Sequence, residues 1–268
     1  MNVLLVNPPT GTRYPQPPLG LLSIAGALEA HKHRVAIVDG NIEELWMGLV
    51  RGKAKVADVV GVTVNSLGYR QAVGVIEMLK SVRPDVPVIV GGPHASALPV
   101  ETWEGTGCDC VVEGEGEAAM VEMLGGKPLP VGVVGRGPRL EMDRLPMPAY
   151  YLVDHRRYRP HAPHGRRRPF MPLVTSRGCP YRCAFCSKSV FGSSYRFQSP
   201  ARTLEELRFL KQMYRIREVA FYDDTFTLNR NRVMELCELL ERSGLDIEWS
   251  CETRVDLVDP ELLGAMRA

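Results

Sequence analysis

Three cysteines, Cys179, Cys183 and Cys186, lie in one short segment that directly follows an apolar run at residues 172–176. Thiolates ligate iron–sulfur clusters, and three of them can hold three irons of a four-iron cluster while the fourth iron has no protein ligand. Such an iron can bind a small chelating molecule, and the amino and carboxylate groups of a methionine-derived sulfonium suit that role. The spacing therefore predicts a [4Fe–4S] site with one open iron.

The sequence gives less support to two other roles for these thiols, a zinc site and disulfide bonds. Structural zinc is almost always four-coordinate, and no second Cys-x-x-Cys pair follows downstream. A zinc site would need His161 or His164 as its fourth ligand, and that alternative stays open. Disulfides are disfavoured because the seven cysteines are odd in number and unevenly spaced, and the N-terminus shows no cleavable secretory segment. We therefore expect reduced thiols in a cytoplasmic protein.

The charge of the chain is nearly balanced, with 33 basic and 31 acidic residues among 268. This balance does not call for a nucleic acid or a membrane surface as a partner. The longest apolar stretches, such as residues 56–64, are strand-length and far shorter than the ~20 residues that cross a bilayer. A hydrophobic content of 45% allows one large domain or two of ordinary size.

The first 125 residues alternate short β-branched runs with amphipathic segments, which indicates a parallel sheet covered on both faces. We expect a doubly wound α/β domain with five parallel strands. Ligands of such sheets bind beyond the carboxyl ends of the strands. The expected strands are 3–6, 35–38, 59–62, 86–90 and 110–112, and the expected helices are 19–30, 42–50, 69–80, 97–104 and 115–124.

Residues 126–168 are rich in Gly, Pro and Arg, which predicts a linker. Its basic cluster is most simply a solvated surface, and contact with an anionic substrate is the alternative. The cluster consists of Arg156, Arg157, Arg159, Arg166, Arg167 and Arg168.

The pattern of residues 169–268 predicts three βα units, as in part of a (β/α) barrel. The expected strands are 172–176, 218–222 and 247–251. We expect a capping box at Thr203 and Glu206, a helix at 231–242 and an N-cap at Asp259. A barrel of this kind places its chemistry at the carboxyl ends of its strands.

Both halves together resemble the cobalamin-binding radical S-adenosylmethionine family, in which a Rossmann-like cobalamin domain precedes a TIM-like radical barrel. The resemblance implies that the partial barrel is truncated here after the third unit. The segment Val62-Thr63-Val64-Asn65-Ser66 and the pair Gly91-Gly92 are similar to the hydroxyl and diglycine elements that line the cobalamin nucleotide tail in that family. A nucleotide-binding Rossmann unit is the alternative, but the first loop lacks Gly-x-Gly-x-x-Gly. The resemblance implies further cofactor contacts at the strand ends. These are Pro8, Pro9, Thr63, Ser66, Gly91, Gly92, Pro93, His94, Glu113, Gly114 and Glu115.

One departure concerns cobalt. The Asp-x-His-x-x-Gly element that supplies a histidine to cobalt in other cobalamin proteins is missing, and no histidine precedes His31. The resemblance then implies cobalt without a histidine as lower ligand. His94 is the alternative ligand, although a histidine after a diglycine more often contacts the cofactor periphery or water.

In the barrel half, the resemblance implies that Cys179, Cys183 and Cys186 ligate the cluster and that Phe185 packs by adenine. It places Asp223 and Asp224 at the amino group of S-adenosylmethionine. Glu252 is implied for the ammonium or ribose and Arg254 for the methionine carboxylate, with a plain ion pair as the alternative for both. The other cysteines are expected to be small buried hydrophobes; they are Cys108, Cys110, Cys237 and Cys251.

The implied activity is a C-methyltransferase that uses a 5′-deoxyadenosyl radical and methylcobalamin to methylate an unactivated carbon. Its partners would be a small-molecule or peptide substrate and an electron donor such as flavodoxin or ferredoxin. Two alternatives stay open: a cobalamin-dependent radical cyclase or rearrangement enzyme, and a non-enzymatic cobalamin-binding protein with a structural zinc loop.

Overall fold

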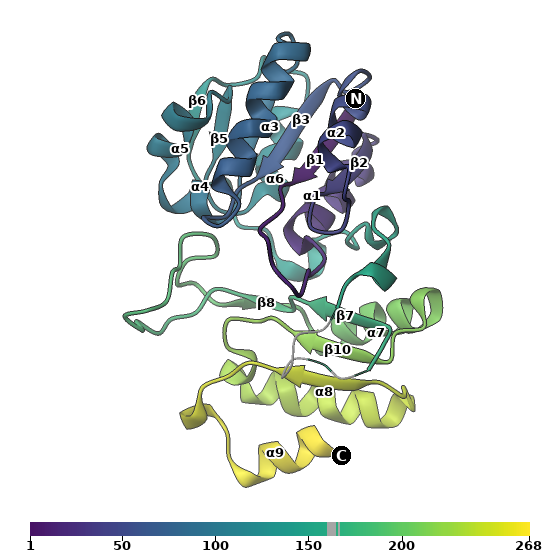
Figure 1. The fold of residues 1–268 in the computed structure, drawn as a ribbon. Helices are drawn as coiled ribbons and strands as arrows, with labels where there is room; N and C mark the ends of the chain where they lie inside the picture. The colour runs from purple at the N-terminus through teal and green to yellow at the C-terminus, as the bar shows by residue number, and fades with distance from the viewer. Residues whose placement is uncertain (160–164, 166) are drawn as a thin grey trace. The chain divides into compact units, whose positions relative to one another are not determined.

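The computed structural model describes residues 1–159, 165 and 167–268, and the chain divides into two units (Figure 1). The first unit comprises residues 1–140 with 146–153 and 187–192. The second comprises residues 141–145, 154–186 and 193–268. The domain limits expected at residues 125 and 168 stay a prediction. The histidines of the zinc alternative, His161 and His164, and also Arg166, lie outside the described residues.

The first unit is built on a parallel sheet with the strand order β2-β1-β3-β4-β5-β6. The doubly wound class is confirmed, but the expected number of five strands is wrong. The additional strand, Gly132–Val134, lies in the segment expected to be a linker and pairs in parallel with the strand at Cys110–Val112. The strands are β1 Asn2–Asn7, β2 Arg34–Asp39, β3 Val59–Thr63, β4 Val88–Gly91, β5 Cys110–Val112 and β6 Gly132–Val134.

Helices cover both faces of this sheet. Side chains of β1 alternate between the faces, so that Leu4 and Val6 pack with α2 and α3 while Val3 and Leu5 pack with α1 and α6. All four are buried, which explains why the strand has no polar alternation. The helices are α1 Leu19–Ala30, α2 Trp46–Ala54, α3 Tyr69–Val82, α4 Pro93–Ala97, α5 Pro99–Thr106 and α6 Gly116–Met123.

Two helix predictions in this unit are corrected. The helix expected from residue 42 begins at Trp46, because residues 40–45 form a turn around Asp39, whose backbone carbonyl accepts hydrogen bonds from Ile42 N and Glu43 N. The helix expected at 97–104 is two short helices that meet at Leu98. Each begins with a proline, which favours the first turn of a helix and interrupts an interior.

The second unit contains a three-stranded parallel sheet with the order β11-β10-β7 and three following helices (Figure 1). The three βα units are thereby confirmed. The strands are β7 Phe170–Leu173, β10 Glu218–Phe221 and β11 Glu248–Cys251, and the helices are α7 Pro200–Tyr214, α8 Arg230–Ser243 and α9 Pro260–Arg267. Short 3₁₀ turns of this unit occur at Met142–Arg144, His155–Arg157, Phe226–Leu228 and Val255–Leu257, and the turn at Tyr150–Leu152 belongs to the first unit.

A two-stranded antiparallel ladder brackets the cysteine segment. The strand expected at residues 172–176 ends at Leu173, and Ser176–Arg177 form a separate strand, β8, that pairs with β9, Arg196–Phe197. Residues 178–195 therefore form a loop whose two feet are hydrogen-bonded together. We call this segment the cluster loop.

Side chains cap all three helices of the second unit. The expected capping box at Thr203 is wrong, because α7 begins after Ser199, whose Oγ accepts from Arg202 N at 3.2 Å. The cap at Asp259 is confirmed by an Oδ1 contact of 2.8 Å with Leu262 N. In the part of the chain that the structure describes, no helix combines the length and the apolar character that a membrane span requires.

Candidate functional site

The three predicted cluster ligands all lie on the cluster loop, at the carboxyl end of β7. Cys179 and Cys183 are half-buried and Cys186 is exposed. The Cys179 Sγ lies 3.3 Å from Thr225 Oγ1, and Cys186 N donates to Cys183 O at 3.1 Å. Among the residues with described positions, no three His, Cys, Asp or Glu side chains converge as a metal site. The donor set still fits a cluster in chemistry, because three accessible thiols belong to one short loop.

The remaining cysteines differ in their surroundings. Cys108, Cys110 and Cys237 are buried, and Cys251 is half-buried. Burial raises the pKa of Cys110 to about 11. Burial, with the nearby Asp223 charge, raises the pKa of Cys251 to about 12. Since metals bind the thiolate, these protonated thiols are poor ligands at neutral pH.

Asp223 and Asp224 follow β10, but their environments are opposite. Asp223 is 1% exposed, and its carboxylate accepts hydrogen bonds from Thr175 and Ser176. Burial raises the pKa of Asp223, and the adjacent guanidinium of Arg232 opposes that shift. Asp224 is exposed, and its Oδ2 accepts from Gly178 N, one residue before the first cluster cysteine, at 3.0 Å.

Arg254 follows β11 and reaches the cluster loop. Its Nη1 lies 3.6 Å from Cys183 Sγ, and its guanidinium carbon is 4.0 Å from the centre of the Tyr181 ring. Nε and Nη2 also donate to Asp256 at 2.9 and 2.8 Å. The ion pair of Arg254 is thus made with Asp256. Glu252 is exposed at the same strand end, and Phe185 is 94% exposed on the loop.

The strand ends of the first unit are built largely from backbone and small side chains. Gly92 has φ 99°, and a Cβ there would lie 2.6 Å from Thr63 Oγ1 and 2.9 Å from Val64 O. Only glycine fits this position. A Cβ at Gly91 would meet only Val112 O at 3.7 Å, which is ordinary contact.

Short polar contacts join the loops after β3 and β4. The Ser66 Oγ and the His94 Nδ1 are 2.9 Å apart, and the ring of Tyr69 lies 4.8 Å from that of His94. After β5, Gly114 has φ 76° and its N donates to Ser96 Oγ at 2.9 Å. The remaining predicted positions also lie beyond strand ends: Pro8 and Pro9 follow β1, Pro93 is the first residue of α4 after β4, and Glu113 and Glu115 follow β5.

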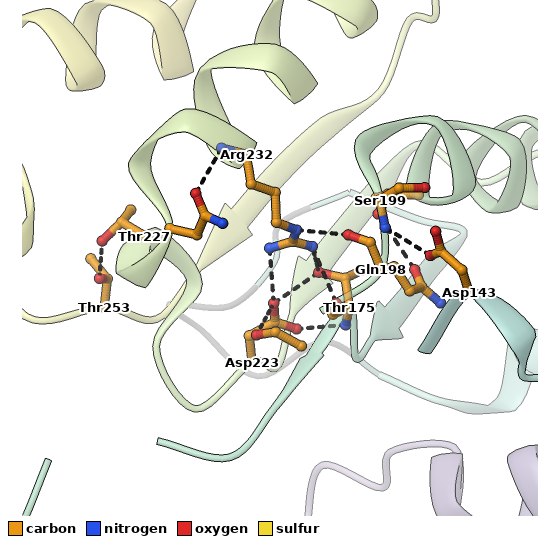
Figure 2. Close-up of polar contacts among 11 residues, drawn as sticks. Asp143, Thr175, Gln198, Ser199, Asp223, Thr227, Arg232 and Thr253 are labelled. Carbon is orange, nitrogen blue, oxygen red and sulfur yellow. Dashed lines mark hydrogen bonds and ion pairs between the residues drawn. The ribbon is translucent and has the colours of Figure 1, made fainter. Parts of the chain in front are cut away.

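Two arginines were missed by the sequence reasoning. Arg232 on α8 is 3% exposed and lies next to Asp223, in contact with Thr175 and Gln198 (Figure 2). Its spacing of four residues from buried Leu236 places it on the apolar face of α8, and that periodicity was the available signal. Arg136 donates to Val190 O at 3.0 Å and also to Ser189 O, all within the first unit.

Known families match both halves of the chain. The model of the B12 binding domain matches residues 11–124, and the model of the Radical SAM superfamily matches residues 173–268. The chain belongs to the cobalamin-binding radical S-adenosylmethionine family. The resemblance inferred from the motifs is thus confirmed.

Curated relatives of this family extend beyond the chain. An uncharacterized methyltransferase of Pyrococcus horikoshii is 34% identical over 100% of this chain and 63% of its own length. The hopanoid C-3 methylase of Methylococcus capsulatus is 32% identical over 90% of this chain and 48% of its own length. The relatives also include proteins named as anaerobic magnesium-protoporphyrin IX monomethyl ester cyclases. The chain therefore spans about half to two thirds of the length of the relatives it matches.

A solved structure shares the fold. The radical S-adenosylmethionine methyltransferase TsrM of Kitasatospora setae aligns over 90% of this chain and 51% of its own, with a TM-score of 0.66 and 24% sequence identity. Because the identity is below 25%, this likeness concerns the fold alone. It supports an α/β domain that is followed by a partial barrel.

Proposed function

We propose that the protein is a cobalamin-dependent radical S-adenosylmethionine methyltransferase that methylates an unactivated carbon of a small-molecule or peptide substrate. One observation carries the proposal: three accessible thiols share one loop at a strand end, in a chain that also contains a B12 binding domain. Methyltransferases and methylases among the relatives support transfer of a methyl group.

In the second unit, Cys179, Cys183 and Cys186 would hold the cluster. When bound, a four-iron cluster supplies the electron that cleaves S-adenosylmethionine, and cobalamin carries the methyl group. The exposed carboxylate of Asp224 suits the ammonium of S-adenosylmethionine, and the exposed ring of Phe185 offers a face to its adenine. An electron donor such as flavodoxin or ferredoxin would reduce the cluster.

In the first unit, the strand ends would hold the cobalamin nucleotide tail. The missing Cβ of Gly92 leaves the backbone of the β3 and β4 loops in close approach. The hydroxyls of Thr63 and Ser66 can exchange hydrogen bonds with a tail that enters this crevice. The ring of His94 is held by Ser66, which suits a contact at the cofactor periphery.

The proposal is tested with anaerobically reconstituted protein, cobalamin and S-adenosylmethionine that carries a trideuterated methyl group, in the presence of a small-molecule extract. We expect release of 5′-deoxyadenosine and a labelled product in which one hydrogen of the substrate is replaced by a trideuterated methyl group. Absence of 5′-deoxyadenosine, or equal release by Cys183→Ala, would contradict radical chemistry at this loop.

A cyclase or rearrangement enzyme is the second candidate, and relatives named as cyclases favour it. It predicts the same release of 5′-deoxyadenosine. The product would then change in structure without gaining the label.

A further inference from the structure

A buried ion pair in the second unit lies against Thr175 and Gln198, the residues that flank β8 and β9 at the base of the cluster loop. Arg232 is 3% exposed and Asp223 is 1% exposed, and Arg232 Nη1 lies 3.7 Å from Asp223 Oδ2 (Figure 2). Burying a guanidinium is costly unless its donors are paired. The groups that it pairs with therefore indicate what the arginine does.

Arg232 reaches both feet of the cluster loop. Its Nε donates to Gln198 O at 2.9 Å, and its Nη2 donates to Thr175 O at 3.2 Å and to Thr175 Oγ1 at 2.6 Å. Thr175 immediately precedes β8, and Gln198 immediately follows β9. One side chain thus joins the chain that enters the loop to the chain that leaves it.

Asp223 holds the segment that enters the cluster loop, at Thr175 and Ser176. Its carboxylate accepts from Thr175 N at 2.6 Å, Thr175 Oγ1 at 2.8 Å and Ser176 Oγ at 2.7 Å. These donors and the guanidinium compensate the buried charge. The carboxylate is turned into the protein, whereas the next residue, Asp224, is exposed.

The loop needs such support because its own ladder is short. β8 and β9 contribute two residues each, and a two-stranded ladder is marginal in water. Closing the loop of residues 178–195 also costs conformational entropy. The rings of Phe197 and Phe226 lie 5.7 and 5.5 Å from the guanidinium carbon of Arg232 and help to keep the pair dry.

We propose that Arg232 is a positioning residue that clamps the two feet of the cluster loop and thereby holds Cys179, Cys183 and Cys186 in register for the cluster. This inference rests on the proposed function, because it presumes that the loop binds a cluster. It also assigns Asp223 to the clamp, which leaves Asp224 as the carboxylate for the ammonium of S-adenosylmethionine.

The test compares Arg232→Met, the double variant Asp223→Asn with Arg232→Met, and the matched control Arg242→Met. Arg242 lies on the same helix but is 75% exposed and pairs with Glu238. Each protein is reconstituted anaerobically with iron and sulfide. Iron and sulfide per folded chain, the unfolding temperature, and hydrogen exchange of residues 176–197 are then measured.

We expect Arg232→Met to unfold at a lower temperature, because it leaves a lone buried carboxylate. Its iron and sulfide per folded chain should fall well below the wild-type values, because loss of a group that orients metal ligands typically weakens binding about 10- to 100-fold. The double variant should regain most of the unfolding temperature but not the cluster. Gln198 O still lacks the Arg232 donor, and Thr175 O keeps only its 2.8 Å hydrogen bond from Gln198 N. The loop of the double variant should exchange hydrogen faster than in the wild type.

A double variant with wild-type cluster content would overturn the clamp, since Arg232 would then serve only to neutralise Asp223. Full cluster content in Arg232→Met, or a loss as large in Arg242→Met, would overturn it as well. A wild-type chain that takes up no iron and sulfide would instead refute the proposed function, and the clamp with it.

Discussion

The strand ends of the first unit and the feet of the cluster loop, which lie in the second unit, are stabilised in different ways. The strand ends require glycine at position 92, because a Cβ there would lie 2.6 Å from Thr63 Oγ1. The feet of the cluster loop are held by a buried ion pair, because Asp223 and Arg232 are both nearly inaccessible to solvent. Addition of a methyl group should therefore damage the first site, whereas removal of a polar group should damage the second.

The largest effect is expected at the cluster loop. Cys183→Ala removes one of three thiolates, and a cluster held by two protein ligands should not persist. We expect loss of most of the iron and acid-labile sulfide per chain after anaerobic reconstitution. Cys237→Ala is the matched control, because this thiol is buried in α8 and its pKa is raised by burial. Equal iron in both variants would contradict the ligand assignment.

At the strand ends, Gly92→Ala should be the most damaging substitution. It combines a left-handed φ of 99° with a steric overlap, so we expect a loss of about 2–5 kcal/mol in the free energy of unfolding. Gly107→Ala separates the two causes, because Gly107 has φ 68° with open space around its Cβ position. That control should cost only about 1–2 kcal/mol. Similar losses in denaturant unfolding would argue against close approach at Gly92.

The two classes of thiol should differ in reactivity in the cluster-free protein. A raised pKa keeps a thiol protonated until the pH nears that value. At pH 8, Cys110, with a pKa of about 11, is thiolate to about one part in a thousand. We expect iodoacetamide to label Cys186 first and to label Cys110 and Cys251 at least about 100-fold more slowly. Mass spectrometry of the labelled peptides measures this, and comparable rates for all three would refute it.

The smallest effect is expected for Ser66→Ala. It removes the 2.9 Å contact with His94 at an exposed position, so the free energy of unfolding should change by less than about 0.5 kcal/mol. Under the proposed function, affinity for hydroxocobalamin should fall by roughly 5-fold, which is the value of one hydrogen bond. Ser81→Ala removes an exposed serine contact on α3 and serves as the control. Unchanged hydroxocobalamin binding would remove Ser66 from the site.

The sequence predicted what depends on local pattern. Short apolar runs located β1 to β5, whereas the short run Val131-Gly132-Val133-Val134 at β6 lies in Gly- and Pro-rich sequence that indicated a linker. The capping-box pattern at Thr203 and Glu206 misplaced the start of α7, which is capped by Ser199 and begins at Pro200. The cysteine spacing pointed to residues 179–186 without any long-range information, and their role as cluster ligands stays a prediction.

The clamp behind the loop depends on contacts that spacing does not encode. Arg232 and Thr175 are 57 positions apart, and Arg232 and Gln198 are 34 apart. Helical periodicity places Arg232 on the buried face of α8, but its charge is typical of a surface. Likewise, adjacent Asp223 and Asp224 look equivalent in the sequence. Only the fold shows that one is buried and the other exposed.

The central claim is that Cys179, Cys183 and Cys186 hold a four-iron cluster. Metal and acid-labile sulfide analysis of the wild-type chain after anaerobic purification and reconstitution tests it most directly. The account predicts about four irons and four sulfides per chain. Zinc at one equivalent, with neither iron nor sulfide, would contradict it and favour a structural metal loop.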